Sequence, residues 1–454
     1  MDYRSQNPAT GAIIGTYPAW DDHRLEQALS RVEAVRPEWQ GMSVTDRGAL
    51  LRGLAVRLRA GGEGYARLIT EEMGKPIREA RAEIEKCALG CEFFAERGPE
   101  LLADEPVASD ARTSYVAWQP LGTVLAVMPW NFPFWQVIRF AAPALVAGNC
   151  ALLKHAPNVP RCAEALEALF LEAGFPRGVF QWLPITHEQA EGIIADPRLH
   201  AVTVTGSPRA GRRLAALAGA ALKKTVLELG GSDPFVVLED ADLERAVAVA
   251  VTARFQAGGQ SCIAAKRFIL VAAIADEFLA RFQRRVEALT VGDPSREDTD
   301  LGPLARADLR ATLHRQVEDS IRAGAQPLTG CRKLDGPGFF YMPSILDQVG
   351  PGMPAHDEEL FGPVAAIVRV RDEDQALAAA NRHRYGLGGS VWTADRARGE
   401  RFARRLESGL AFVNGLVKSD PRLPFGGVKE SGHGRELGAL GLREFCNAKC
   451  VWIG

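Results

Sequence analysis

A cysteine directly after a Gly-rich turn is the first residue of this sequence that predicts chemistry. The segment GGQSC, residues 258–262, lies between a predicted helix and a predicted strand. A thiol in such a turn can face a cleft, where adjacent backbone N–H groups can lower its pKa or bind an oxyanion. The alternative is a small residue that serves only the tight turn. Cys262 is therefore a candidate nucleophile.

A glutamate at the end of a predicted strand is a candidate general base. In VLELGGSDP, residues 226–234, the strand ends on Glu228 and the chain then turns through Gly230 and Gly231. A carboxyl group in this position, beside backbone that needs close approach, can accept a proton during catalysis. A solvated charge at a strand end is the alternative.

An asparagine between two prolines is a candidate ligand for an oxyanion. The segment MPWNFPFW, residues 128–135, predicts a strand, a rigid turn and then a helix, which would fix the side chain of Asn131. Its NH2 group could stabilise negative charge on a reacting oxygen. Asparagine also caps helices, which is the alternative reading.

A Gly-Ser pair between a strand and a helix is a candidate phosphate site. In VTVTGSPRAG, residues 202–211, Gly206 and Ser207 precede a predicted helix N-terminus, which suits a pyrophosphate. The sequence has no GxGxxG pattern at this position, so the usual dinucleotide motif is absent.

These candidates require an α/β framework. Residues 24–97 carry apolar side chains at three- and four-residue spacing and predict helices. Short apolar runs then alternate with helical stretches from about residue 120 to 229, and again from about 230 to 420. Such alternation predicts two parallel sheets, each buried on both faces. Strand candidates at 112–119 and in the terminal CVWIG predict a third, small β element.

Composition excludes several classes of protein. With 454 residues, the chain is long enough for two or three lobes. The 54 Lys and Arg against 56 Asp and Glu give no reason to expect nucleic acid or an anionic membrane as a partner. The eight cysteines and eight histidines form no disulfide or metal-ligand pattern. We see no signal peptide and no apolar run of membrane-spanning length, and we expect a cytoplasmic protein without a metal.

Together, these segments resemble the aldehyde dehydrogenase superfamily, and within it the bacterial succinate-semialdehyde dehydrogenases. NPATG, PWNFP, LELGG, GQSC, EELFGPV and PFGGVKESGHGRE occur in family order from residue 7 to residue 436. The resemblance implies two Rossmann-like parallel-sheet lobes plus a small β-strand oligomerisation element. It also implies oxidation of an aldehyde to a carboxylate with NAD or NADP, with succinate semialdehyde as the favoured substrate.

The resemblance also implies catalytic roles. Cys262 corresponds to the nucleophile, Glu228 to the general base, and Asn131 to the side chain that forms the oxyanion hole with the Cys262 backbone N–H. Thiolate attack would give a thiohemiacetal, loss of hydride a thioester, and Glu228 would activate the hydrolytic water. Relatives that transfer the acyl group to CoA often lack this base, so Glu228 favours hydrolysis.

Six positions correspond to cofactor-binding residues of the family. They are Trp130, Lys154, Gly206, Ser207, Glu359 and Phe361. Many NAD-preferring relatives carry a glutamate three residues after the lysine, and Pro157 stands there in this sequence. Without that carboxylate, Lys154 and His155 could tolerate the 2′-phosphate of NADP, so we expect dual use of NAD and NADP.

Three positions are implied in substrate binding. Arg139, eight residues after Asn131, corresponds to an arginine that binds the distal carboxylate of succinate semialdehyde, and Ser419 to a serine that serves the same carboxylate. The alternative for Arg139 is an ion pair with a carboxylate of the protein. Gln256 stands where two-arginine relatives carry their second arginine, which predicts broader or weaker selection for ω-carboxylate aldehydes.

The resemblance predicts a domain organisation and an oligomer. Residues 1–111 and 120–229 would bind the cofactor, residues 230–420 would form the catalytic domain, and residues 421–439 would return to the cofactor-domain side. Residues 112–119 and 440–454 would form the oligomerisation element of a homodimer or homotetramer. A broader aliphatic or amino-aldehyde dehydrogenase, and a non-catalytic binding or structural member of the fold, are the alternatives.

Overall fold

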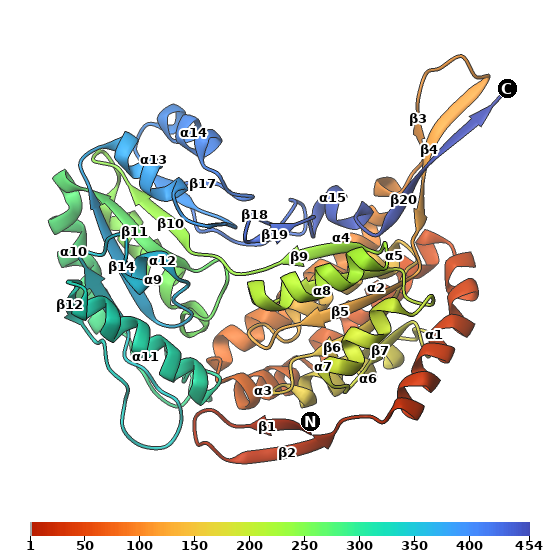
Figure 1. Ribbon diagram of the computed structural model, residues 1–454, viewed down its shortest axis with the longest axis horizontal. Helices are drawn as coiled ribbons and strands as arrows, with labels where there is room; N and C mark the ends of the chain where they lie inside the picture. Colours follow the sequence, from red (N-terminus) through yellow and green to blue (C-terminus); the bar gives the residue numbers. More distant parts are fainter. Residues whose placement is uncertain (1) are drawn as a thin grey trace.

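Two α/β lobes lie side by side in the computed structural model, which describes residues 2–454 (Figure 1). One lobe is built on a six-stranded sheet and the other on a seven-stranded sheet. The predicted α/β class with two parallel-sheet lobes is confirmed.

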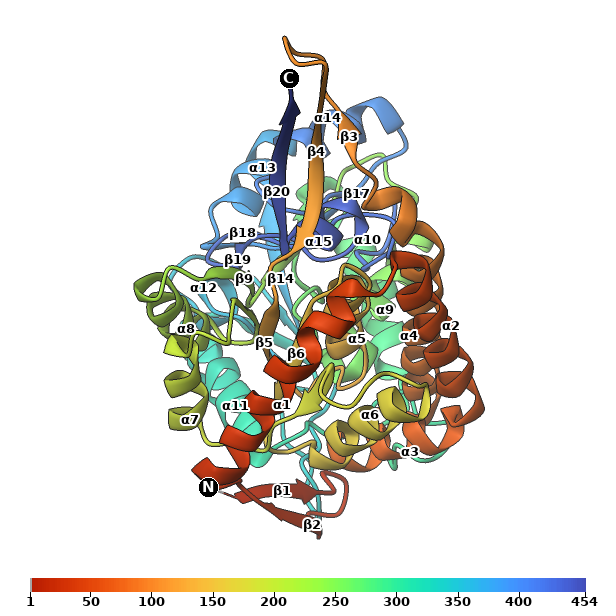
Figure 2. The same ribbon diagram turned by 90° about the vertical axis from the view of Figure 1, so that its right-hand side faces the viewer.

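The six-stranded sheet has the order β19-β9-β8-β5-β6-β7, and all its neighbours are parallel except β19 and β9. Strands β6 and β8 are buried along their whole length, because helices lie on both faces of the sheet (Figures 1 and 2). The chain order reverses between β5 and β8, and ligands of open α/β sheets bind at the carboxyl ends of strands at such a switch point. The strands are β5 (Thr123–Met128), β6 (Cys150–His155), β7 (Phe180–Trp182), β8 (Ala201–Thr205), β9 (Lys224–Glu228) and β19 (Gly432–His433).

Helices before and between these strands complete the first lobe. An N-terminal helical segment forms where three- and four-residue spacing predicted it, and α2 and α4 pack closely on each other. The helices are α1 (Asp22–Gly41), α2 (Val44–Ala60), α3 (Gly62–Met73), α4 (Ile77–Leu101), α5 (Trp135–Val146), α6 (Pro160–Glu172), α7 (His187–Gly192), α8 (Pro208–Ala220) and α15 (Gly438–Arg443).

The seven-stranded sheet has the order β12-β13-β14-β11-β10-β16-β17, and only β12 runs antiparallel to its neighbour. Its strands are β10 (Asp233–Val237), β11 (Ala265–Val271), β12 (Gln326–Thr329), β13 (Ser344–Asp347), β14 (Val364–Val370), β16 (Ser390–Trp392) and β17 (Phe412–Val413). The helices of this lobe are α9 (Leu243–Phe255), α10 (Ala272–Glu287), α11 (Ala307–Arg322), α12 (Pro354–Asp357), α13 (Glu373–Asn381) and α14 (Arg396–Arg405). The remaining short strands, β15 (Tyr385–Gly386) and β18 (Val428–Lys429), pair with each other.

A three-stranded antiparallel arm projects from the first lobe (Figures 1 and 2). Strand β4 (Thr113–Pro120) pairs with β20 (Cys446–Ile453) along the full length of both and with β3 (Glu105–Pro106) on its other side. Predicted strand segments from opposite ends of the chain therefore lie together.

An N-terminal hairpin was not foreseen from the sequence. Strands β1 (Asp2–Gln6) and β2 (Ile13–Pro18) pair antiparallel with a register shift at Ser5 and Gln6. The hairpin lies against the first lobe, where Tyr3 is buried and its hydroxyl donates to the Ile185 carbonyl. Because β2 leaves even Ile13 and Ile14 exposed, no hydrophobic alternation marked it as a strand.

Candidate active site

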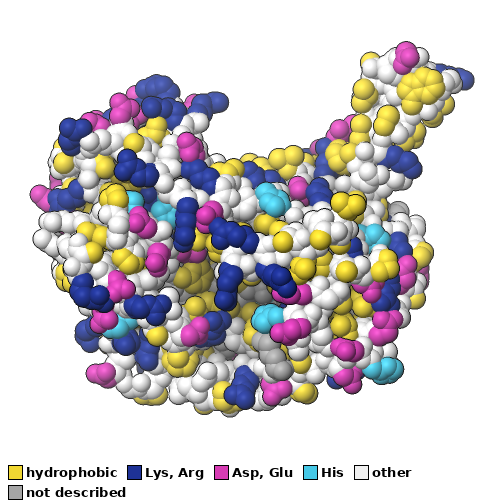
Figure 3. Space-filling model, viewed as in Figure 1, with side chains coloured by type: hydrophobic (Ala, Val, Ile, Leu, Met, Phe, Trp, Pro, Cys, Tyr) yellow, Lys and Arg dark blue, Asp and Glu magenta, His cyan; other side chains and the backbone are white. Residues whose placement is uncertain are grey.

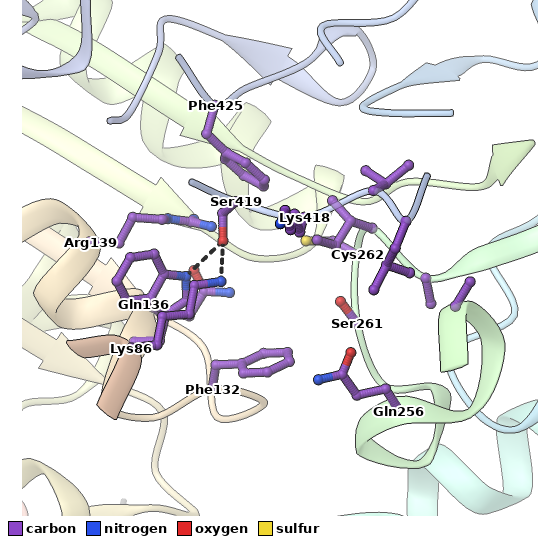
Figure 4. A pocket seen from close by; sticks show the side chains of 16 residues that line it. Lys86, Phe132, Gln136, Arg139, Gln256, Ser261, Cys262, Lys418, Ser419 and Phe425 are labelled. Atoms are coloured by element: carbon purple, nitrogen blue, oxygen red, sulfur yellow. Dashed lines mark hydrogen bonds between the residues drawn. The ribbon is translucent and has the colours of Figure 1, made fainter. Parts of the chain in front are cut away.

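Two cavities meet at Cys262. The smaller cavity measures about 250 Å³ and extends from Cys262 towards α4 and α5 (Figure 4). The larger cavity measures about 480 Å³ and extends from Cys262 to the carboxyl ends of β5, β6 and β8. Figure 3 shows the surface hollowed between the two lobes, with Lys and Arg side chains bordering the hollow. Cys262 therefore has access to two separate ligand spaces.

A strained turn brings Cys262 to this position. After α9 the backbone passes through left-handed conformations at Ala257, Gly258 and Gly259, with φ of 54°, 62° and 71°. A side chain at Gly259 would lie 2.5 Å from the carbonyl oxygen of Gly362, so this position requires glycine. The glycines of the GGQSC segment thus place Cys262 just before β11.

Lys266 fastens the end of the same turn. Its buried Nζ donates to the carbonyl oxygens of Ser261 at 2.7 Å and Cys262 at 2.8 Å. The same ammonium forms an ion pair with Glu359 at 3.2 Å. Lys266, which the sequence did not single out, therefore connects the cysteine turn to the EELFGPV segment.

The thiol of Cys262 is predominantly protonated at neutral pH. Burial raises its pKa to about 11, although the cations of Arg139 and Lys266 lower it in part. The net shift of this pKa is upward because desolvation outweighs the nearby positive charges.

Glu228 ends β9 as a buried carboxyl group without a hydrogen-bond partner for either oxygen among the described residues. Burial raises its pKa well above the usual range, and the neighbouring Glu436 raises it further. The alternative of a solvated strand-end charge is therefore wrong. The carboxyl group lies against Gly426, where a Cβ atom would be 2.7 Å from Oε1, and Glu228 is not among the residues that line either cavity. A buried carboxyl group with a raised pKa can serve as a general base, and this role of Glu228 stays a prediction.

Asn131 lies in the loop between β5 and α5 and lines the larger cavity together with Cys262. Its Nδ2 donates to the Gln260 carbonyl at 2.9 Å, which orients the amide and leaves the second N–H hydrogen free. The N-cap of α5 is Phe134, so Asn131 does not cap this helix.

The larger cavity has the features of a phosphate-binding site at its switch-point end. Ser207 caps the 13-residue helix α8, accepting from the Ala210 N–H at 3.3 Å. At Gly206 a Cβ atom would meet nothing within 4 Å, so space is open in front of this helix N-terminus. Lys154, at the end of β6, is buried on the cavity wall and forms no ion pair within residues 2–454. These features fit an anionic cofactor.

At the other end of the larger cavity, an acid and two aromatic rings lie near Cys262. The carboxylate of Glu359 accepts a hydrogen bond from the Gly231 N–H at 3.1 Å. It also lies close to Gly230, where a Cβ atom would be 2.4 Å from the Glu359 carboxylate. The rings of Trp130 and Phe361 pack edge to face with their centroids 5.8 Å apart. The LELGG glycines therefore make room for Glu359.

His155 is a neutral residue of the larger cavity wall. Its buried ring bonds to the Pro133 carbonyl at 2.9 Å, and burial lowers its pKa to about 4. A neutral imidazole cannot attract a 2′-phosphate. Arg209, an exposed residue of α8 that the sequence did not single out, lines the larger cavity and is a cation there. Pro157 lines the same cavity.

Arg139 is paired with a carboxylate of the protein. Its guanidinium forms an ion pair with Glu436, and only 2% and 3% of the two side chains are exposed. It also stacks on Phe425, 4.5 Å from the ring centroid, and lines the smaller cavity. The alternative considered from the sequence, an internal ion pair, is the one that the structure contains.

Ser419 and Gln256 lie on opposite walls of the smaller cavity (Figure 4). Ser419 is buried and accepts hydrogen bonds from Lys86 Nζ at 2.6 Å and Trp135 Nε1 at 3.1 Å. Gln256 is exposed near Cys262. Lys86 is a cavity residue that no sequence motif indicated. The sequence could have indicated Lys86 only by its place in an amphipathic helix, where it is next to the buried Cys87.

Neither a metal centre nor a membrane span is found in the part of the chain that the structure describes. No group of three or more His, Cys, Asp and Glu side chains among residues 2–454 is arranged to hold a metal ion. None of the helices in this range is both long and apolar enough to cross a membrane.

Comparison with known proteins shows the family of this chain. The family model described as "Aldehyde dehydrogenase family" matches residues 1–451. The chain belongs to the aldehyde dehydrogenase family. The resemblance inferred from the motifs is thereby confirmed.

Named relatives of this aldehyde dehydrogenase cover almost its whole length. A Synechocystis sp. protein named "Probable succinate-semialdehyde dehydrogenase" with NADP+ is 51% identical over 447 residues, 98% of each chain. The succinate semialdehyde dehydrogenase Sad of Escherichia coli, named as using NAD(P)+, is 49% identical over 99% of this chain and 97% of its own. The crystal structure of succinic semialdehyde dehydrogenase from Streptococcus pyogenes with NADP+ superposes with a TM-score of 0.97, at 36% identity and 99% coverage of both chains. The aldehyde dehydrogenase fold is confirmed as well.

Proposed function

We propose that the chain oxidises succinate semialdehyde to succinate with NAD+ or NADP+. The observation that carries this substrate is the charge of the smaller cavity. Lys86, Arg139 and Lys418 line it, whereas none of its lining residues is Asp or Glu. A cavity with this charge favours an aldehyde whose far end is an anion. The names of the relatives at 49–51% identity support the same substrate.

The larger cavity would hold the cofactor. Gly206 and Ser207 at the α8 N-terminus would bind the pyrophosphate, and Lys154 the adenine ribose. Glu359 would bind the nicotinamide ribose, with Trp130 and Phe361 beside the ring. When bound there, the nicotinamide cofactor supplies a hydride acceptor.

Three residues would carry the covalent chemistry. The Cys262 thiol would first lose its proton to solvent, and the thiolate would then add to the aldehyde carbon. The free N–H hydrogen of Asn131, with the Cys262 backbone N–H, would stabilise the alkoxide of the thiohemiacetal. After oxidation to the thioester, Glu228 takes a proton from the water that attacks the acyl carbon. Burial, which raises its pKa, makes this carboxylate a stronger proton acceptor than an ordinary glutamate.

We propose that the two lobes have different roles, one in cofactor binding and the other in catalysis. Residues 1–111 and 120–229 would bind the cofactor and residues 230–420 would carry the nucleophile, while residues 421–439 return to the first lobe through β19. The arm of residues 112–119 and 440–454 would pair with another copy in a homodimer or homotetramer. Trp452 and Ile453 of this arm are 55% and 49% exposed, and Val107 of the adjoining segment is 50% exposed. Figure 3 shows hydrophobic side chains gathered on the projecting arm. A cytoplasmic location also stays a prediction.

A substrate panel tests the proposed function. We would measure kcat/KM for succinate semialdehyde, glutarate semialdehyde, an amino-aldehyde and butanal, each with NAD+ and NADP+, using Cys262→Ala as the blank. We expect kcat/KM for succinate semialdehyde to exceed that for butanal by at least about 30-fold, which corresponds to the contribution of one charge-assisted hydrogen bond. A higher kcat/KM for the amino-aldehyde or for butanal would refute succinate semialdehyde as the preferred substrate. No reduced cofactor with any aldehyde would indicate a non-catalytic member of the fold.

A further inference from the structure

Lys86 reaches the smaller cavity from helix α4. Its ammonium lies 4.5 Å from the ring centroid of Trp135 and donates to the Ser419 hydroxyl at 2.6 Å. In Figure 4, the side chains of Lys86, Arg139 and Ser419 converge on one end of the cavity, away from Gln256. This end is therefore the place where positive charge is concentrated.

The two cations at this end differ in their counter-charges. Arg139 is neutralised by its buried ion pair with Glu436. The two acids of α4 nearest to Lys86 in sequence, Glu85 and Glu83, are both engaged elsewhere. Glu85 forms an ion pair with Arg59 at 2.8 Å. Glu83 lies one helical turn before Lys86. Its carboxylate pairs with Lys75 and accepts the backbone N–H groups that begin α5, at 2.9 and 3.0 Å.

Lys86 therefore has no carboxylate partner among the described residues. Its contacts are a hydroxyl oxygen and an aromatic face, and neither carries a full negative charge. An ammonium ion that is largely removed from water without a counter-ion is unfavourable, and burial accordingly lowers the pKa of Lys86 to about 8. An anionic ligand would remove this cost.

The hydroxyl of Ser419 has a matching property. Its oxygen accepts from Lys86 and from the Trp135 indole, and no acceptor for its own hydrogen is recorded within residues 2–454. Because a hydroxyl group carries one hydrogen to donate, that hydrogen can turn to an oxygen in the cavity. One cation and one donor thus face the same point.

We infer that Lys86, and not Arg139, supplies the positive charge that binds the distal carboxylate of the substrate, with the Ser419 hydroxyl as a second donor. This inference rests on the proposed function, since it names the residue that selects the semialdehyde. Lys86 is a specificity residue at the far end of the cavity. Arg139 keeps Glu436 neutralised beneath the same wall.

The test compares two aldehydes that differ at one end. Butanal has the carbon chain of succinate semialdehyde with a methyl group in place of the carboxylate. Lys86→Met should lower kcat/KM for succinate semialdehyde about 30- to 100-fold, mainly by raising KM. The kcat/KM for butanal should change by less than about threefold. Lys86→Arg retains the charge and should recover most of the loss. Arg97→Met removes a charge from the exposed end of α4 and should leave kcat/KM unchanged for both aldehydes.

Three results would overturn the inference. The first is an equal loss with both aldehydes, which would give Lys86 a structural role. The second is an unchanged preference in Lys86→Met. The third is a larger selective loss in Lys418→Met, a change at the exposed lysine of the cavity. If Lys86→Met does not fold, Lys86→Gln replaces it, and loss of butanal turnover in both would count against the inference.

The same data separate this inference from the proposed function. A wild-type enzyme without preference for succinate semialdehyde over butanal would refute the proposed substrate. A wild-type preference that persists in Lys86→Met would refute only the assignment to Lys86.

Discussion

Arg139 and Glu436 form a buried ion pair between the wall of the smaller cavity and the surroundings of Glu228. Glu436 raises the pKa of Glu228, and Arg139 lowers the pKa of both glutamates. The arginine therefore balances two buried carboxyl groups, which gives its replacement a different expected outcome from that of a substrate-binding residue.

Arg139→Met should reduce activity with charged and neutral aldehydes alike. Removing one partner leaves Glu436 buried and uncompensated, which costs about 3–5 kcal/mol of folding stability. Urea unfolding and kcat/KM with succinate semialdehyde and butanal measure both effects, and Arg139→Met/Glu436→Gln should restore part of the stability. A selective rise in KM for succinate semialdehyde, with stability unchanged, would show instead that Arg139 binds the distal carboxylate of the substrate.

Glu228→Gln should stop turnover after the first half-reaction. Glutamine has a similar shape but cannot take a proton from water, so the thioester on Cys262 would persist. Rapid-mixing experiments should show a burst of reduced cofactor close to one equivalent per active site, followed by a steady rate lower by at least about 100-fold. An unchanged steady rate would mean that another group activates the water.

The preference for the charged substrate should fall as the pH rises. The Lys86 ammonium is the carboxylate-binding form, and its pKa of about 8 means that the charge is lost as the pH rises through this value. The charged groups around it, Arg139, Glu83 and Lys75, are held in ion pairs, and the pKa of the nearby Cys87 thiol is raised well above the usual range. The raised pKa values of the catalytic thiol and base make both reactions faster at higher pH, and this effect cancels in a ratio.

The measurement for this pH prediction is the ratio of kcat/KM for succinate semialdehyde to that for butanal, between about pH 7 and pH 10. The ratio should decline above about pH 8 in the wild type and stay flat in Lys86→Met. A flat ratio in the wild type would contradict the prediction.

Pro157→Glu should shift the enzyme towards NAD+. A carboxylate at this position of the larger cavity would repel the 2′-phosphate of NADP+ and accept hydrogen bonds from the ribose of NAD+. We expect kcat/KM with NADP+ to fall about 10- to 100-fold relative to NAD+, and the wild type to use both cofactors within a ratio of roughly a thousand. Pro157→Ala serves as the uncharged control. An equal effect of both substitutions would show that charge is not the cause.

Trp452→Glu with Ile453→Lys should reduce the oligomeric state. Both side chains are about half exposed at the end of β20, where they would be buried between copies of the arm. Light scattering after gel filtration should show a smaller species than the wild type. Val56→Glu, at a 65% exposed position of α2, is the matched control. A wild-type monomer would refute the proposed role of the arm.

Local sequence patterns were sufficient for the framework. Alternating apolar runs and helical periodicity predicted the parallel strands β5, β6 and β8 because periodicity is a property of neighbouring residues. Turn glycines beside Cys262 and Glu228 marked these two residues as candidates for the same reason. The hairpin β1–β2 was not predicted because β2 is mostly exposed, and the inward positions of β1 are Tyr3 and the polar Ser5, so neither strand has a hydrophobic period.

The sequence by itself determined the α/β lobes, the family, and the positions of Cys262, Glu228 and Asn131. Only the tertiary structure decided which charges are compensated. Arg139 is paired because folding brings residues 139 and 436 together. Lys86 has no carboxylate partner within residues 2–454, because Glu83 turns to Lys75 and the start of α5 and Glu85 pairs with Arg59. It also decided that His155 is neutral and that the pKa of Cys262 is raised. Counter-charge and desolvation depend on spatial neighbours, which a linear pattern does not contain.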